Sequence, residues 1–138
     1  MSIKPAWTHG TSVQLQTKSW TADRQGFFTT VKPSPGETSG WVHFAIPTVG
    51  QKLKAKSAMI YFSTGSQASI GAIHVYDGKT LIHPSAPLNL KGQDQFYLEP
   101  IPNQPEVKFG VGISLQLNFN GVGPDAFIQL IGAGIEFI

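Results

Sequence analysis

The sequence predicts an all-β fold, an antiparallel two-sheet sandwich of jelly-roll type with nine to ten strands and essentially no helix. Apolar and polar residues alternate along most of the chain, as in strands with one buried face, and the 3.6-residue period of a helix is nearly absent. The 15 glycines and 10 prolines punctuate the 138 residues. Short strands separated by closely spaced turns are typical of sandwiches and barrels.

The first half of the chain contains four predicted strands, each ended by residues that favour turns. Val13 and Leu15 alternate with polar residues in the first strand, and Phe27 and Phe28 lie in the second. A Pro-Ser-Pro-Gly-Glu segment follows the second strand, and Pro47 ends the third because proline cannot donate a ladder hydrogen bond. The four strands are expected at residues 11–17, 26–32, 40–46 and 53–64.

The second half contributes five or six further strands. Asp77-Gly78 between two apolar runs is a strong signal for a two-residue hairpin turn. A proline-rich loop precedes the longest strand, and glycines after Asn120 turn the chain back toward the last one. These strands are expected at residues 68–76, 79–82, 88–90, 95–98, 107–120 and 127–138, of which 88–90 is the shortest.

The segment VKFGVGISLQLNFN at 107–120 alternates without interruption, so one face is wholly apolar and the other is small or polar. Gly110 and Gly112, followed by Ser114, predict a shallow trough on the polar face, since glycine in a strand often marks a close approach. An aromatic side chain from a neighbouring strand or subunit could cover the trough. Alternatively, a ligand could lie there and hydrogen-bond Gln116 and Asn118, or the face could meet solvent.

The last segment, FIQLIGAGIEFI, is apolar on both faces. One face is expected to carry Phe127, Ile131, Ile135 and Phe137, and the other Ile128, Leu130 and Ile138. Such a strand is either central and covered or packs against another subunit.

The predicted core comprises Val13, Phe28, Val42, Phe44, Ile60, Phe62, Ile73, Val75, Phe109, Val111, Ile113, Leu115 and Leu117.

Composition excludes several classes of function. The net charge of +2, with 13% charged residues, lacks the concentrated basic footprint of a nucleic-acid-binding protein. No cysteine is present, so disulfides and thiolate metal sites are ruled out. No apolar run reaches the ~20 residues of a membrane helix, and no signal peptide is visible, which makes the cytoplasm the default compartment without determining it. Residues 1–138 are expected to form one domain.

Two predicted strands each place a histidine beside an aromatic residue on the face opposite the core. In WVHFAI, Trp41 and His43 point away from the core, and in IGAIHVYDG, His74 and Tyr76 do so. These side chains either decorate a solvated sheet or form a ligand platform. On such a platform the aromatic rings would stack on an apolar or sugar ring, and the imidazoles would donate hydrogen bonds.

Sequence signals for catalysis are weak. No Gly-x-Ser-x-Gly nucleophile motif occurs, most carboxylates lie in turns, and no local His-x-His spacing suggests a metal site. No catalytic residue, metal ligand or cofactor is therefore predicted. The alternative is a small β-sandwich enzyme of hydrolase, lyase or cyclase type that uses His43 or His74 with a carboxylate.

The segments GWVHFAIPTVG, IHVYDG, LNL, VKFGVGISLQLNF and GAGIEFI resemble those of an uncharacterised family of small bacterial all-β proteins, a domain of unknown function. The similarity covers roughly residues 41–138. It implies a compact β-sandwich and a bacterial source, and it implies no catalytic or binding residues.

The sequence thus favours a non-catalytic binding or assembly module. The protein is expected to form a homo-oligomer, to bind a carbohydrate or another small molecule on a sheet face, or both, as lectin-like sandwiches do. The expected ligand-binding residues are Trp41, His43, His74, Tyr76, Gln116 and Asn118.

Overall fold

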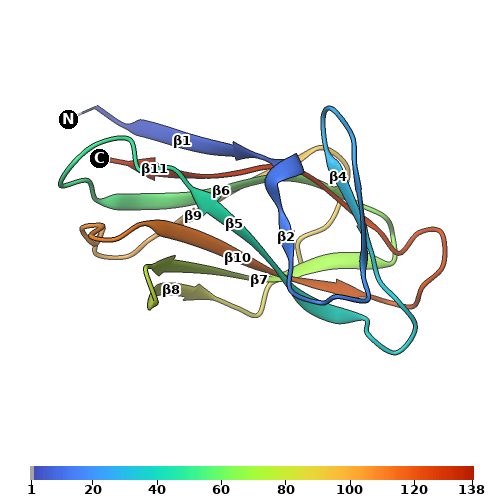
Figure 1. The fold of residues 1–138 in the computed structure, drawn as a ribbon. Helices are drawn as coiled ribbons and strands as arrows, with labels where there is room; N and C mark the ends of the chain where they lie inside the picture. The colour runs from blue at the N-terminus through green and yellow to red at the C-terminus, as the bar shows by residue number, and fades with distance from the viewer. Residues whose placement is uncertain (1) are drawn as a thin grey trace.

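The computed structural model describes residues 2–138, which form two antiparallel sheets packed face to face (Figure 1). In sheet A, β1 (Lys4–His9) and β4 (Thr29–Lys32) both pair with the same edge of β11 (Ile128–Phe137), each along a different half of that strand. The strands of sheet A are, in spatial order, β3 (Thr21–Arg24), β4 (Thr29–Lys32), β11 (Ile128–Phe137), β6 (Ala55–Thr64) and β9 (Gln95–Pro100), with β1 (Lys4–His9) beside β11.

Sheet B lies against sheet A and is ordered β2 (Gln14–Leu15), β5 (Ser39–Ile46), β10 (Val111–Phe119), β7 (Ala68–Asp77) and β8 (Thr80–Ser85). The orders β4-β11-β6-β9 and β5-β10-β7-β8 are those of a jelly roll, in which the chain crosses between the sheets at nearly every connection. The predicted all-β jelly-roll sandwich is therefore confirmed. A 3-10 turn, η1 (Gly10–Ser12), joins β1 to β2, and residues 2–138 contain no helix that could span a membrane.

Eleven strands are formed by residues 2–138, rather than the nine or ten predicted. β1 and β3 were not expected from the sequence, and the expected strand at 11–17 is reduced to η1 and the two-residue β2. The short segment 88–90 forms only an isolated bridge between Leu90 and Ile70. These differences all concern short edge segments, in which too few residues alternate for a strand to be predicted.

The core lies between the inner faces of the sheets and contains nearly every residue predicted for it. Phe28 is only half-buried and packs edge-on against Phe27, with ring centroids 4.3 Å apart. Phe109 was predicted to be in the core, and this is wrong, because its side chain is 83% exposed.

The position of Phe109 follows from where β10 begins. The strand starts at Val111 rather than at residue 107, and Gly110 has φ +145°, a conformation that breaks the alternation. The carboxylate of Asp77 accepts hydrogen bonds from the backbone N–H groups of Lys108, Phe109 and Gly110 at 2.9, 2.8 and 3.2 Å. The segment is thus a loop tied to the end of β7.

β11 is the central strand of sheet A, and it is covered on both faces. A register irregularity between Leu130 and Gly132 moves Ile131 out of the alternation. Ile128 and Leu130 therefore share the core-facing side with Ile135 and Phe137, whereas the sequence placed them on opposite faces. On the other face, Trp7 lies over Gly132 and Gly134. Of the two interpretations of this strand, the structure supports the central and covered one.

Candidate functional site

The outer face of sheet B brings the predicted histidines and aromatic residues together. Because β10 runs between β5 and β7, the pairing register places Ser114 directly between His43 and His74. The neighbouring positions of β10 are Gly112, beside Tyr76, and Gln116, beside Trp41. Residues two apart on a strand share a face, so these side chains form successive rows across one surface.

The aromatic rings lean over β10 from both sides. The ring centroids of Trp41 and His74 are only 4.8 Å apart, with an interplanar angle of 47°. Their strands, β5 and β7, are separated by β10, so the two backbones lie about twice the ~4.8 Å spacing of adjacent strands apart. The ring of His74 also lies near that of Tyr76, with centroids 6.3 Å apart and an interplanar angle of 59°. Ser114, below the rings, is only 7% exposed. This part of the predicted trough is therefore covered by protein.

The glycine end of the trough is open. A Cβ at Gly112 would meet only the backbone oxygen of Phe44, at 3.7 Å, and Gly110 lies in the loop, where a Cβ would have nothing within 4 Å. The aromatic cover expected over both glycines is therefore absent among the described residues.

His43 is held in one tautomer by its partners. Its Nε2 lies 2.6 Å from Gln16 Oε1, which can only accept, so Nε2 carries the proton and donates it. Its Nδ1, 2.7 Å from Ser114 Oγ, accepts from that hydroxyl. Burial lowers the pKa of His43 below its ordinary value, which keeps the ring neutral at neutral pH.

The pKa of His74 is also lowered, first by burial and then by the nearby His83. Both imidazoles of this surface are therefore neutral at pH 7, and the surface offers uncharged donors and acceptors. These side chains and their neighbours enclose a concave depression of about 340 Å³ that is lined by Gln16, Trp41, His43, His74, Tyr76 and Ser114. We call it the sheet B depression.

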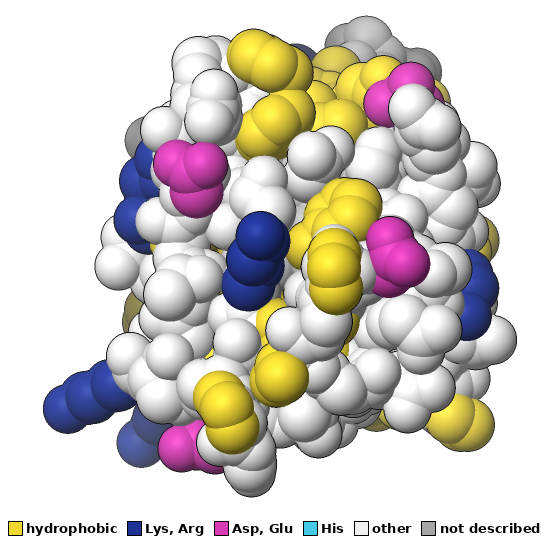
Figure 2. All heavy atoms as spheres, turned by 90° about the vertical axis from the view of Figure 1, so that its right-hand side faces the viewer, with side chains coloured by type: hydrophobic (Ala, Val, Ile, Leu, Met, Phe, Trp, Pro, Cys, Tyr) yellow, Lys and Arg dark blue, Asp and Glu magenta, His cyan; other side chains and the backbone are white. Residues whose placement is uncertain are grey.

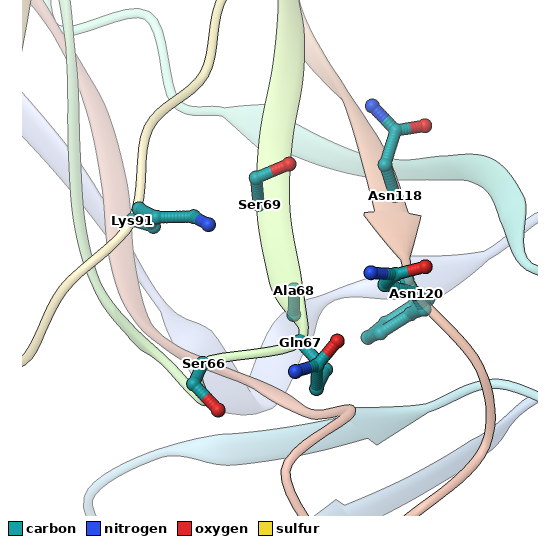
Figure 3. A pocket seen from close by; sticks show the side chains of 8 residues that line it. Ser66, Gln67, Ala68, Ser69, Lys91, Asn118 and Asn120 are labelled. Carbon is teal, nitrogen blue, oxygen red and sulfur yellow. The ribbon is translucent and has the colours of Figure 1, made fainter.

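Gln116 and Asn118, the other two predicted site residues, do not line the sheet B depression. Their amides lie above Gly71, where an added Cβ would collide with Asn118, and Asn118 Oδ1 accepts from Ser39 Oγ at 2.7 Å. Asn118 instead lines a second hollow of about 240 Å³, together with Lys91, Ser69 and Asn120 (Figure 3). Of the six predicted residues, four therefore line the sheet B depression, Asn118 lines the second hollow, and Gln116 lines neither.

Gln16 is a site residue that was not predicted from the sequence. Gln16 follows β2, and its backbone N–H donates to Trp41 O at 3.0 Å, which places its side chain beside His43. No local signal could have shown this, because the contact depends on β2 pairing with β5. Ser114 was recognised as part of the trough but not as a partner of an imidazole.

The geometry does not support the enzyme alternative. In residues 2–138, neither His43 nor His74 hydrogen-bonds a carboxylate. Asp77, the nearest candidate in sequence, has its carboxylate engaged by backbone N–H groups. The histidine that does meet an acid is His83, 3.0 Å from Glu99, at the edge formed by β8 and β9. Within the described residues no three His, Asp or Glu side chains are grouped to hold a metal ion.

The end of the sandwich where β10 turns into β11 has no comparable surface. Figure 2 shows hydrophobic, basic and acidic side chains interspersed over this end, and no histidine is visible there. The imidazoles and their aromatic neighbours belong to the sheet face rather than to this end. These features define a class of protein, a jelly-roll β-sandwich with an aromatic, uncharged depression on an open sheet face.

The chain belongs to a family described as a family of unknown function, DUF6623, whose model matches residues 1–138. The resemblance to an uncharacterised all-β family is thereby confirmed, and the match also includes residues 1–40, where no motif was recognised. No curated protein sequence matches the chain significantly.

Solved structures with this fold include carbohydrate-binding modules. CBM29_1, a family 29 carbohydrate-binding module from Piromyces equi, is 11% identical, with a TM-score of 0.60 over 99% of this chain and 91% of its own. CBM86, a low-affinity xylan-binding module from Roseburia intestinalis, is 12% identical, with a TM-score of 0.61 over 98% and 96%. A mutant of CBM29-2 complexed with mannohexaose is 10% identical, with a TM-score of 0.58 over 99% and 93%. At these identities the likeness concerns the fold alone.

Proposed function

We propose that this protein is a non-catalytic carbohydrate-binding module and that the sheet B depression holds the sugar. The observation that carries the proposal is the row of Trp41, His74 and Tyr76 beside neutral hydrogen-bonding groups in one concavity. Sugar rings have apolar C–H faces that stack on aromatic rings and hydroxyl edges that need hydrogen-bond partners. Binding sites with an apolar lining and a few fixed polar groups suit such ligands.

Each side chain has a role in this proposal. The rings of Trp41 and Tyr76 are half-buried and would stack on the sugar. His43 and Gln16 orient one another, and the remaining amide N–H groups of Gln16 would donate to sugar hydroxyls. Gln116 and Asn118 would contact a longer chain that continues along β10 toward the second hollow. The fold shared with carbohydrate-binding modules supports this choice of ligand class.

Calorimetric titration with mannohexaose and with xylohexaose tests the proposal. Trp41→Ala and Tyr76→Ala should each weaken binding about tenfold, because each removes one stacking ring. Phe109→Ala is the matched control, since this exposed aromatic ring lies in a loop outside the depression. Unchanged affinity in both ring variants, with an intact fold by circular dichroism, would contradict the assignment of the depression.

Self-association is a second property that the sequence predicts, and it stays a prediction. One of the two segments on which this prediction rests is the two-sided apolar segment 127–138, and Trp7 lies over the outer face of its strand, β11. Light scattering at micromolar concentration gives the mass, and a monomer would end the homo-oligomer proposal.

A further inference from the structure

Sheet A also presents large apolar side chains on its outer face, and the proposed function does not use them. Trp7 of β1, Tyr61 of β6, and Phe96 and Leu98 of β9 are 43%, 37%, 56% and 39% exposed. The pairing register places Trp7, Met59 and Leu98 in one row across the sheet, and Tyr61 and Phe96 in the next row. We call Trp7, Tyr61, Phe96 and Leu98 the sheet A surface.

Trp7 lies flat on the sheet because β11 has glycines beneath it. A Cβ at Gly132 would be 3.3 Å from Trp7 Cε3, and one at Gly134 would be 3.1 Å from Trp7 Cδ2. Any larger residue at these positions would lift the indole away from the strand. One face of the ring therefore rests on β11, and the opposite face is directed to solvent.

The rings of the sheet A surface converge over the middle of the sheet. β1 and β9 are separated by β11 and β6, a distance of roughly 14 Å between backbones, yet the centroids of Trp7 and Phe96 are 6.0 Å apart. Met59 lies on this outer face, outside the core, and is only 4% exposed. The exposed side chains thus form a continuous apolar layer rather than separate residues.

Among the described residues, carboxylates lie beyond the two apolar rows, and His9 lies at the β1 end of the Tyr61–Phe96 row. The next row on one side contains Glu136, which accepts a hydrogen bond from Ser57. On the other side, the backbone N–H of Asp94 donates to Ser63 Oγ at 2.8 Å. The apolar layer itself carries no Lys, Arg, Asp or Glu. An uncharged occupant therefore suits it better than an ion, an acidic peptide or an anionic lipid.

The size of the layer argues against a second copy of the chain as its occupant. With about 200 Å² for each large side chain, the exposed fractions amount to roughly 350 Å². A stable protein interface needs about 800 Å² from each partner. Apolar patches of roughly 300–600 Å² on monomers are often functional, and this one has the size for a few linked sugar rings.

We propose that the sheet A surface is a second carbohydrate-binding surface, which takes the apolar face of an extended, uncharged polysaccharide chain. It differs from the sheet B depression in that exposed apolar side chains make up most of it, and its one imidazole, that of His9, lies at the β1 end of the Tyr61–Phe96 row. Such an apolar layer suits chains laid side by side in an insoluble polysaccharide. The two surfaces face opposite sides of the sandwich. One molecule can therefore hold two polysaccharide chains, and this inference shares only the class of ligand with the proposed function.

Depletion of the protein from solution by cellulose powder, insoluble mannan and insoluble xylan tests the second surface. Phe96→Ala should weaken binding to at least one of these solids by about fivefold or more, and Phe96→Tyr, which keeps the ring, should retain it. Phe109→Ala is the neutral control, because this phenylalanine is even more exposed than Phe96 and lies in a loop outside the sheet A surface. Trp7→Ala should act like Phe96→Ala, and thermal unfolding shows whether that variant still folds.

The outcomes separate the two surfaces. Loss of solid-phase binding in Phe96→Ala, with its mannohexaose affinity unchanged, supports the second surface. Wild-type binding by Phe96→Ala, or no binding of the wild-type protein to any of the three solids, overturns it. A wild-type dimer that Phe96→Ala converts to a monomer also overturns it, because the occupant is then a second copy. The proposed function is judged separately, by the effect of Trp41→Ala on binding of soluble oligosaccharide.

Discussion

Asp77 is the residue whose replacement the structure predicts most directly. Its side chain is 7% exposed at the end of β7, and its carboxylate accepts three backbone hydrogen bonds from the loop at 108–110. The same loop is tied to the hairpin by the bond from Gly78 N–H to Gly110 O at 2.8 Å. Asp77→Ala removes all three carboxylate bonds without touching the core between the sheets.

The magnitude follows from the number of bonds and their exposure. A hydrogen bond to a charged group contributes about 1.5–3 kcal/mol. Lys108 and Phe109 are exposed, so water replaces part of what their N–H groups lose. We therefore expect Asp77→Ala to lower the free energy of unfolding by about 2–4 kcal/mol. Asp77→Asn should cost less, because the amide keeps one oxygen to accept these bonds.

Urea unfolding at neutral pH measures the change. With a slope of about 1–3 kcal/mol per molar urea, the midpoint should fall by about 1–2 M. Hydrogen exchange should also accelerate at the amides of residues 108–110 and stay slow in β10. A change in unfolding free energy below about 0.5 kcal/mol, or unchanged exchange at these amides, would refute the reasoning.

The stabilisation by Asp77 should depend on pH. Burial alone would raise the pKa of Asp77, but the backbone N–H groups of residues 108–110 and the charge of Lys108 lower it below its ordinary value of 3.8. Because the folded-state pKa is lowered, the contribution is complete above this ordinary value and is lost as the pH falls below it. Wild type and Asp77→Asn should therefore converge in stability in acid, and a constant difference down to the acid transition would contradict this.

Three further predictions concern the core, the sheet A surface and a tyrosine. Leu115→Ala, at a fully buried position, should cost about 3–5 kcal/mol in urea unfolding; a cost below 1 kcal/mol would mean that the core collapses into the gap. Gly134→Val should lower stability by about 1–3 kcal/mol, because its Cβ would meet Ala6 O at 2.6 Å, and it should expose Trp7, seen as a red shift of tryptophan fluorescence. The hydrogen bond to Glu99 at 2.7 Å, together with burial, raises the pKa of Tyr97 to about 12. Glu99→Gln should lower that pKa in an ultraviolet titration, and an unchanged pKa would mean that burial alone sets it.

The alternation at 111–119 and the presence of two sheets could be predicted from the sequence because both depend on local period. Each residue from Val111 to Phe119 faces the side that its place in the period requires. The prediction failed at Phe109, where the pattern continues in the sequence but the backbone does not. The reason is that Asp77, more than thirty residues earlier, holds residues 108–110 as a loop.

The candidate site shows the same division. That Trp41 and His43 share a face, and that His74 and Tyr76 do so, follows from the period of two within each strand. The contacts of Asn118 do not follow from this period, because they depend on the neighbouring strands: its amide lies above Gly71 of β7 and accepts a hydrogen bond from Ser39 of β5.

The sequence by itself determined the fold class and the outward faces of the site strands. Only the tertiary structure decided which side chains on those faces come together. β10 lies between β5 and β7, so the rings of Trp41 and His74 converge over a strand distant from both in sequence. Trp7 acquires its role in the same way, because β1 pairs with β11 at the opposite end of the chain. In a jelly roll nearly every pairing joins strands that are not consecutive in sequence, and local pattern carries no information about such contacts.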